Sequence, residues 1–118
     1  MISVQEIEHL AKRILRTRYS SSTQINLTTI RIGLQNNGFM DIFQSVKDEK
    51  KFAFHAQFPD GRIYRLDDRP ERAYKRLATF PWHFHDGSEN KVVKSPFSTL
   101  KSKALAQFFR YVHNIVKS

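Results

Sequence analysis

The sequence predicts an α+β fold, in which an antiparallel meander sheet of four to five strands has an N-terminal and a C-terminal helix packed on it. Apolar residues recur at intervals of three and four near both ends of the chain. Between them, four segments with alternating side chains follow one another, separated by turns too short for anything but antiparallel neighbours. The 118 residues, 40% of them hydrophobic, are enough for one core, so residues 1–118 are expected to form a single domain.

The N-terminal helix is predicted to begin after Ser3. Ser3 is a favourable N-cap, and Glu6 three residues later completes the pattern of a capping box. Acidic residues come early in this segment and basic residues late, which suits the helix dipole. We expect the helix to end near the serines at 20–22. Its apolar face would consist of Val4, Ile7, Leu10, Ala11, Ile14 and Leu15.

The strands of the meander are predicted from β-branched and aromatic residues with a period of two. The four segments are residues 25–34, 39–46, 51–58 and 62–68. Polar and glycine-containing turns separate them, namely Asn36-Asn37-Gly38, Asp48-Glu49-Lys50 and Pro59-Asp60-Gly61. In the third segment one face would carry Phe52, Phe54, Ala56 and Phe58, and the other Ala53, His55 and Gln57.

The last third of the chain is less regular. Residues 69–77, RPERAYKRL, are basic and fit either a mobile loop or a short helical turn. Residues 91–95 fit a short fifth strand, which Pro96 would end. Ser98 or Thr99 would cap a final helix through Lys117. The side chains available to pack that helix on the sheet are Leu105, Phe108, Phe109, Val112, Ile115 and Val116.

The composition limits the classes of function. The chain has 20 Lys and Arg against 11 Asp and Glu, a formal net charge of +9, which favours a polyanionic partner such as nucleic acid, although many small basic proteins are merely soluble. The absence of cysteine excludes disulfides, thiol nucleophiles and thiolate zinc sites. No signal peptide or membrane-spanning segment is expected in the first thirty residues, so we expect a cytoplasmic protein that does not bind membranes.

The most unusual stretch of the chain is TFPWHFHDG, residues 79–87. If residues 80–85 are extended, alternation separates the aromatic side chains from the two histidines. The aromatic face would be Phe80, Trp82 and Phe84, and the opposite face Pro81, His83 and His85. Two imidazoles on one face suit acid and base catalysis at neutral pH, a shared metal ion, or a hydrogen-bonded strand edge.

The metal interpretation requires further ligands. Only Asp67, Asp68, Asp86 or the distant His55 could supply them. A His-x-His pair alone is a weak signal, so we expect no metal ion and no other cofactor.

The fourth predicted strand adds a second polar cluster. Arg65 and Asp67 are two residues apart and share a face. They suit an ordinary ion pair or a guanidinium that binds phosphate and is oriented by a carboxylate. The chain has no P-loop, dinucleotide fingerprint, nucleophile elbow or HExxH motif, which sets those classes of enzyme aside.

The order of these pieces resembles the TumE-like toxins of prokaryotic toxin-antitoxin systems, over roughly residues 30–116. Members carry a strand with arginine, tyrosine, aspartate and asparagine, followed by a proline segment rich in histidine. Arg65, Asp67, Pro81, His83 and His85 match this pattern. The chain departs from it at Leu66, where tyrosine is common, at Asp68, where asparagine is usual, and at Trp82, which replaces the first histidine.

The resemblance implies a growth-inhibiting toxin that a cognate antitoxin neutralises, with RNA or the ribosome as the expected target. The leading hypothesis is a metal-independent ribonuclease, in which His83 and His85 transfer protons, Arg65 stabilises phosphate charge and Asp67 orients a neighbour. A translation inhibitor is the related possibility.

Two alternatives involve no catalysis. In the first, the chain is an RNA-binding module whose cations contact phosphate, and these would be Arg69, Arg72, Lys75, Arg76, Lys91 and Lys94. In the second, it is a protein-binding domain that meets an antitoxin or forms a homodimer. The aromatic residues available for such contact are Phe97, Phe108, Phe109 and Tyr111.

Overall fold

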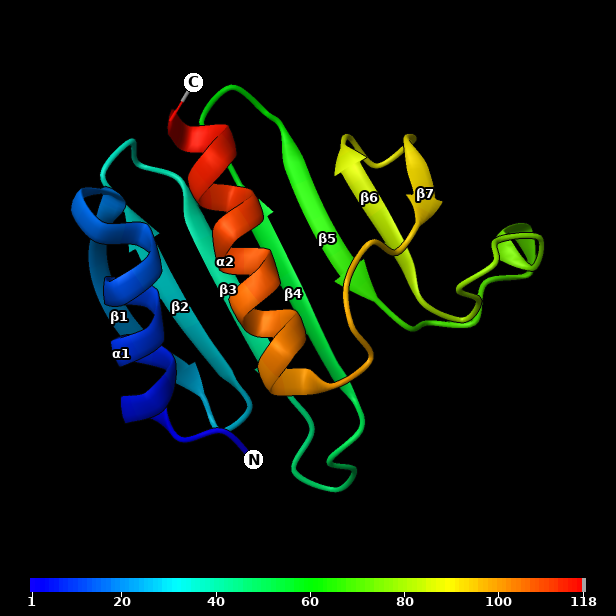
Figure 1. Cartoon of the computed structure of the whole chain (residues 1–118), viewed down its shortest axis with the longest axis horizontal. Helices are drawn as coiled ribbons and strands as arrows, with labels where there is room; N and C mark the ends of the chain where they lie inside the picture. Colours follow the sequence, from blue (N-terminus) through cyan, green and yellow to red (C-terminus); the bar gives the residue numbers. More distant parts are fainter. Residues whose placement is uncertain (118) are drawn as a thin grey trace.

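The computed structural model describes residues 1–117, which form one seven-stranded antiparallel sheet with both α-helices on the same face (Figure 1). The strands lie side by side in chain order, so the predicted meander and its two terminal helices are confirmed. The elements are α1 (Val4–Leu15), a 3₁₀ turn (Arg16–Arg18), β1 (Tyr19–Asn26), β2 (Thr29–Leu34), β3 (Phe39–Gln44), β4 (Phe52–Gln57), β5 (Ile63–Asp67), a second 3₁₀ turn (Arg72–Tyr74), β6 (His83–Gly87), β7 (Val92–Lys94) and α2 (Lys101–Lys117).

The predicted count of four to five strands was wrong, and the first reason is a hairpin near the N-terminus. The segment 25–34 is two strands, because the chain turns between Asn26 and Thr29. The Asn26 Oδ1 atom accepts hydrogen bonds from the Thr28 backbone N–H and hydroxyl, both at 2.9 Å, which fixes this turn. The serines at 20–22 belong to β1, and Ser21 and Ser22 pair with β2.

The second reason is the histidine segment. It forms a strand of its own, β6, which pairs with β5 on one side and β7 on the other. The strand begins at His83, because residues 78–81 form a turn with a cis peptide bond before Pro81. The predicted alternation therefore fails at Phe80, which lies in that turn. The short fifth strand that was expected at 91–95 is β7.

The start of α1 and the turns follow the predictions, but α1 ends at Leu15, before the serines at 20–22 where its end was expected. Ser3 caps α1 and its hydroxyl accepts the Glu6 backbone N–H at 3.1 Å. Asn37, in the turn between β2 and β3, has a φ of 70°, which asparagine tolerates better than most residues. Residues 69–77 contain the short helical turn. The final helix begins at Lys101, two residues later than expected.

One face of the sheet packs on the helices to form the core. Side chains of β2 to β5 alternate between buried and more exposed, and the buried ones form one cluster with apolar residues of α1 and α2. Phe108 and Phe109 of α2 are fully buried, and Phe97 and Tyr111 pack against the same core. These aromatic residues therefore belong to the core and do not form the exposed patch that would have favoured a homodimer. No helix in residues 1–117 is long and apolar enough to cross a membrane.

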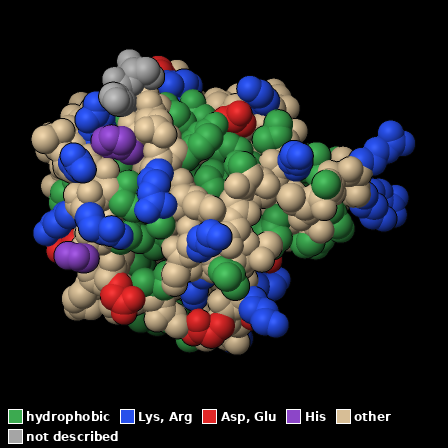
Figure 2. Space-filling model, viewed as in Figure 1, with side chains coloured by type: hydrophobic (Ala, Val, Ile, Leu, Met, Phe, Trp, Pro, Cys, Tyr) green, Lys and Arg blue, Asp and Glu red, His purple; other side chains and the backbone are tan. Residues whose placement is uncertain are grey.

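The face of the sheet opposite the helices, called the open face below, carries the polar side chains. Strand register places Arg31, Asp41, His55, Arg65 and His85 in one row across five strands. On the face that carries the helices, basic side chains are scattered, and several gather at the projecting end of the molecule, where the segment 69–77 lies (Figure 2). The charge of +9 is thus spread out, with one concentration beside β5 and β6.

Candidate functional site

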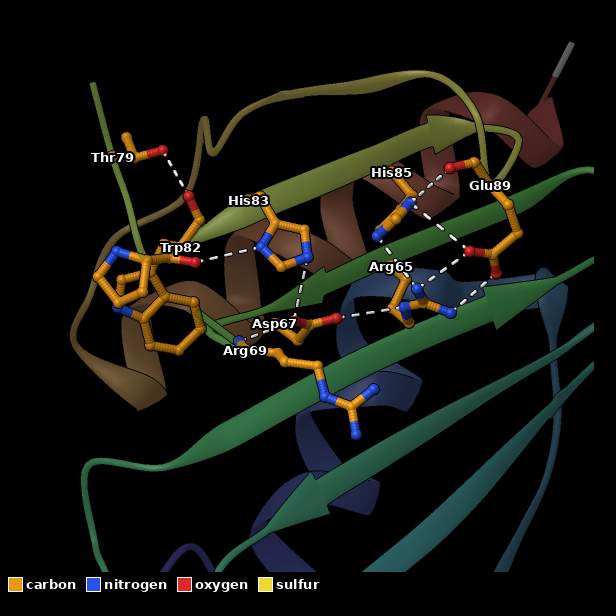
Figure 3. A network of polar contacts seen from close by, with 9 residues as sticks. Arg65, Asp67, Arg69, Thr79, Trp82, His83, His85 and Glu89 are labelled. Carbon is orange, nitrogen blue, oxygen red and sulfur yellow. Dashed lines mark hydrogen bonds and ion pairs between the residues drawn. The ribbon is translucent and has the colours of Figure 1, made fainter. Parts of the chain in front are cut away.

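Pairing of β5 with β6 brings together the four residues that the sequence singled out. Arg65 lies opposite His85, and Asp67 lies opposite His83. Neighbouring strands are about 4.8 Å apart, so side chains on one face of such a pair are in contact. Figure 3 shows the four side chains pointing toward one another.

The four residues line a cleft of about 840 Å³ on the open face. The second wall of the cleft is formed by residues that follow β5. They include part of the basic segment 69–77, which is called the excursion below. The lining residues are Phe43, Lys51, Phe52, Ala53, Arg65, Asp67, Asp68, Arg69, Pro70, Glu71, Tyr74, His83, His85, Glu89 and Asn90.

Hydrogen bonds to its two ring nitrogens indicate that His85 is neutral. Its Nδ1 lies 3.0 Å from the Glu89 carbonyl oxygen, which can only accept, so Nδ1 carries the proton. Its Nε2 lies 3.1 Å from an Arg65 N–H group, which can only donate, so Nε2 offers a lone pair. Burial lowers the pKa of His85, the bond to the Glu89 carbonyl opposes that shift, and the Arg65 charge lowers the pKa further.

The surroundings of His83 are of the opposite kind. Its Nδ1 lies 3.1 Å from the Pro81 carbonyl oxygen, and its Nε2 lies 3.1 Å from Oδ1 of Asp67. Both partners accept hydrogen bonds, so the arrangement suits an imidazolium ring that donates from both nitrogens. The Asp67 carboxylate is itself held by the Arg69 backbone N–H at 2.9 Å and by Arg65 Nε at 3.2 Å.

The guanidinium of Arg65 occupies the centre of this network. Two of its nitrogens donate to the two carboxylate oxygens of Glu89, at 2.8 and 3.0 Å. This bidentate geometry is also the one that arginine uses to bind phosphate. The Glu89 side chain is 55% exposed, so solvent reaches the carboxylate that holds this position.

Comparison with known proteins gives one match, to the family model of Toxin TumE, which covers residues 4–116. The chain belongs to the TumE toxin family. No curated protein and no solved structure matches it. The match spans every strand and almost all of both helices, and it confirms the resemblance seen in the sequence. Membership gives the chain the role of a toxin and suggests an antitoxin as its partner.

Two site residues of this TumE family member were not predicted from the sequence. The Tyr74 ring lies 4.6 Å from the His83 ring and 6.2 Å from the His85 ring, and it covers both. Glu89, in the turn after β6, binds Arg65 and His85. The only signals were a single aromatic residue inside the basic segment and an acid four residues after His85.

The predicted nucleic-acid contacts take different positions. Arg69 lines the cleft, and the exposed cations Arg72, Lys75 and Arg76 belong to the excursion beside it. Lys94 is exposed on β7, directly opposite His83 in the ladder. Lys91 lies 3.6 Å from the Asp86 carboxylate, so its charge is already partly balanced. Of these six predicted contacts, only Arg69 is among the residues that line the cleft.

A metal ion is the other chemistry that this TumE family site could hold. Ring nitrogens of His83 and His85 and an oxygen of Asp67 all lie within 4.8 Å of one another. However, Arg65 lies 3.1 Å from His85 Nε2, and its positive charge opposes a cation at this position. Of the other expected ligands, Asp86 accepts the Tyr111 hydroxyl and His55 bonds Gln57, whereas Asp68 lines the same cleft. The charge of Arg65 is thus the feature of this site that weighs against a metal ion.

Proposed function

We propose that this TumE-family toxin is a metal-independent endoribonuclease. One observation carries the proposal: the two buried histidines have complementary hydrogen-bond partners beside one arginine at a cleft, a donor at His85 Nε2 and an acceptor at His83 Nε2. His85 offers an unprotonated Nε2, and His83 suits the doubly protonated form. A base and an acid in reach of the same group are what cleavage of a phosphodiester by its own 2′-hydroxyl requires.

The proposed step uses these two groups in turn. His85 Nε2 takes the proton of the ribose 2′-hydroxyl, and the 2′ oxygen attacks phosphorus. The bond from phosphorus to the 5′ oxygen breaks, and His83 gives that oxygen a proton. The products are a 2′,3′-cyclic phosphate and a 5′-hydroxyl, with His85 charged and His83 neutral until they exchange protons with water.

Arg65 would stabilise the charge that develops on the phosphate. Its guanidinium is already oriented to donate to two oxygens in one plane, since it now donates to the two carboxylate oxygens of Glu89. We infer that phosphate enters by displacing the Glu89 carboxylate, which is on an exposed turn and therefore free to move aside. Asp67 would hold His83 and Arg65 in orientation through its contacts with both.

The cellular consequence of such cleavage would be arrest of growth. RNA in the cytoplasm is the expected substrate, and the cations around the cleft would attract it. A cognate antitoxin would neutralise the toxin, as the family membership suggests.

A second candidate function is inhibition of translation by binding RNA without cutting it. The observation that favours it is burial: His83 and His85 are each 2% exposed, whereas the cations of the excursion are exposed. In that case phosphate contacts alone would provide affinity, and binding would weaken steeply with salt.

The test is incubation of purified protein with RNA in the presence of EDTA. The ribonuclease proposal predicts fragments from the parent protein and none from the His83→Ala/His85→Ala double variant. Binding that weakens with salt, with no fragments from either protein, would contradict cleavage and favour the second candidate.

A further inference from the structure

The cleft on the open face extends well beyond the two histidines. Its volume of about 840 Å³ is larger than one phosphate group needs and falls within the range of pockets that hold whole small molecules. The side of the cleft formed by β3 and β4 is lined by Phe43, Lys51 and Ala53. These residues have no part in the proposed proton transfer, so this half of the cleft is free to hold another portion of a ligand.

The hollow in this half results from one small side chain in a row of large ones. Phe43 pairs with Ala53 across β3 and β4. The β4–β5 ladder has Phe54 opposite Leu66, so the same register continued by one residue places Ala53 next to Asp67. Asp67 in turn pairs with His83. With strands about 4.8 Å apart, the backbones at Phe43 and Asp67 are separated by about 10 Å, with only an alanine methyl group between them.

The next row along the strands shows that the hollow is local. There the position that corresponds to Ala53 is His55, which lies between Asp41 and Arg65. The His55 ring extends toward Phe39, with ring centroids 6.2 Å apart, and its Nε2 bonds Gln57. A full side chain therefore occupies the space that the alanine leaves open in the neighbouring row.

The chemistry of this hollow fits a nucleobase. Its floor is a methyl group, one wall is the Phe43 ring, which is 37% exposed although it is apolar, and Lys51 adds a positive charge at its edge. Aromatic side chains beside a basic groove are the means by which proteins hold unstacked bases. The site is also continuous with the Arg65 phosphate position, so one nucleotide could reach both.

We propose that the hollow over Ala53 is a nucleobase subsite with Phe43 as its stacking residue, and that the substrate is therefore single-stranded RNA. A base inside a duplex is already stacked on both faces and cannot enter the hollow. This inference rests on the proposed action on RNA, and it adds the form of RNA that is recognised.

The experiment measures affinity for a 2′-O-methyl oligonucleotide, which cannot be cleaved, by fluorescence anisotropy. The Phe43→Ala variant is expected to bind about tenfold more weakly, since one base stacked on an aromatic ring contributes a factor of that order. Phe43→Tyr should restore affinity, and Ala53→Val should lower it by filling the hollow. Leu27→Ala is the matched control, because Leu27 is 85% exposed, apolar and outside the lining of the cleft.

A second comparison separates stacking from a general loss of affinity. The parent protein should bind the single strand more tightly than the same strand annealed to its complement, and Phe43→Ala should reduce that preference. Equal affinity for both forms, unchanged affinity in Phe43→Ala, or no binding of any oligonucleotide would overturn the subsite. Because no cleavage is measured, a protein that binds as predicted but leaves RNA intact would refute only the ribonuclease proposal.

Discussion

Two arginine and aspartate pairs lie in neighbouring parts of the open face, and they behave differently. Arg31 on β2 donates both its hydrogen bonds to Asp41 on β3, at 2.8 and 2.9 Å, and its guanidinium stacks over the Phe39 ring. Arg65 on β5 divides its donors among Asp67, Glu89 and His85. Arg31 thus makes its side-chain hydrogen bonds to one partner, whereas Arg65 shares its donors among several partners, and a ligand could replace one of them.

The strands that carry the pairs differ in the same way. On β3 buried and exposed side chains alternate, as expected when only one face is covered. On β6 three successive residues from His83 to His85 are buried, because Tyr74 and Glu89 cover the second face. Residue type alone thus does not distinguish a structural ion pair from a site. What distinguishes the Arg65–Asp67 pair is its neighbours, because Tyr74 and Glu89 cover the site and Glu89 accepts hydrogen bonds from Arg65.

The largest expected effect concerns the histidines. His85→Ala and His83→Ala should each lower the rate of RNA cleavage by about 10² to 10⁴, the usual contribution of a general acid or base. His55→Ala is the control, since His55 lies in the same row directly opposite Arg65 but bonds only to Gln57. Initial rates of cleavage of one RNA check this. Equal losses of rate in the His55 and His85 variants would show that the β5–β6 site does not differ from the rest of the row.

Substitution of the arginines tests the comparison directly. Arg65→Gln should lower kcat by about 10² or more, because it removes the donors that face the developing charge. Arg31→Gln should leave kcat unchanged and lower the free energy of unfolding by about 1 kcal/mol or less, as expected for a partly exposed pair. Rates and denaturant unfolding curves of both variants provide the measurement. A comparable loss of rate in Arg31→Gln would show that the whole row acts on the substrate.

The pH dependence should reveal the state of His85. A base acts only when unprotonated, and burial lowers the pKa of His85 from its ordinary value of 6.5. The low-pH limb of the cleavage rate should therefore rise with pH through a midpoint below 6.5. An NMR titration of the His85 ring should give the same midpoint, and a midpoint above the ordinary value would contradict the assignment of His85 as the base.

The smallest effect is expected at Glu89. Glu89→Gln removes the charge that competes with phosphate for Arg65, so affinity for RNA should increase by up to about fivefold, in line with the strength of an exposed ion pair. Glu49→Gln is the control, because Glu49 is also an exposed acid in an ion pair, with Lys101, but is outside the lining of the cleft. A titration of labelled oligonucleotide measures the change, and weaker binding by Glu89→Gln would show that the carboxylate supports the site.

The sequence was informative wherever a local pattern determined the outcome. The Ser3 cap, the turn at Asn37 and the common face of Arg65 and Asp67 follow from residue type and a period of two. Strand β1 was missed because its serines, threonine and glutamine have no apolar alternation, and it forms by pairing with β2.

The candidate site was predicted in part for a related reason. The sequence grouped His83 and His85 with Asp67 and Arg65 through the resemblance to the family, and the structure shows that they pair across two strands that are consecutive in the meander. Tyr74 and Glu89 belong to connections, whose path depends on packing that no short-range pattern encodes. The protonation states of the histidines depend on these same partners, so they too required the structure.

The central claim is that the site on β5 and β6 cleaves RNA through the 2′-hydroxyl without a metal ion. The most direct measurement is end-group analysis of an oligodeoxynucleotide that contains a single ribonucleotide, incubated with the protein in EDTA. The account predicts one cut, after the ribonucleotide, with a 2′,3′-cyclic phosphate on one fragment and a 5′-hydroxyl on the other. No cut, a cut that requires a metal ion, or fragments with a 5′-phosphate would contradict it.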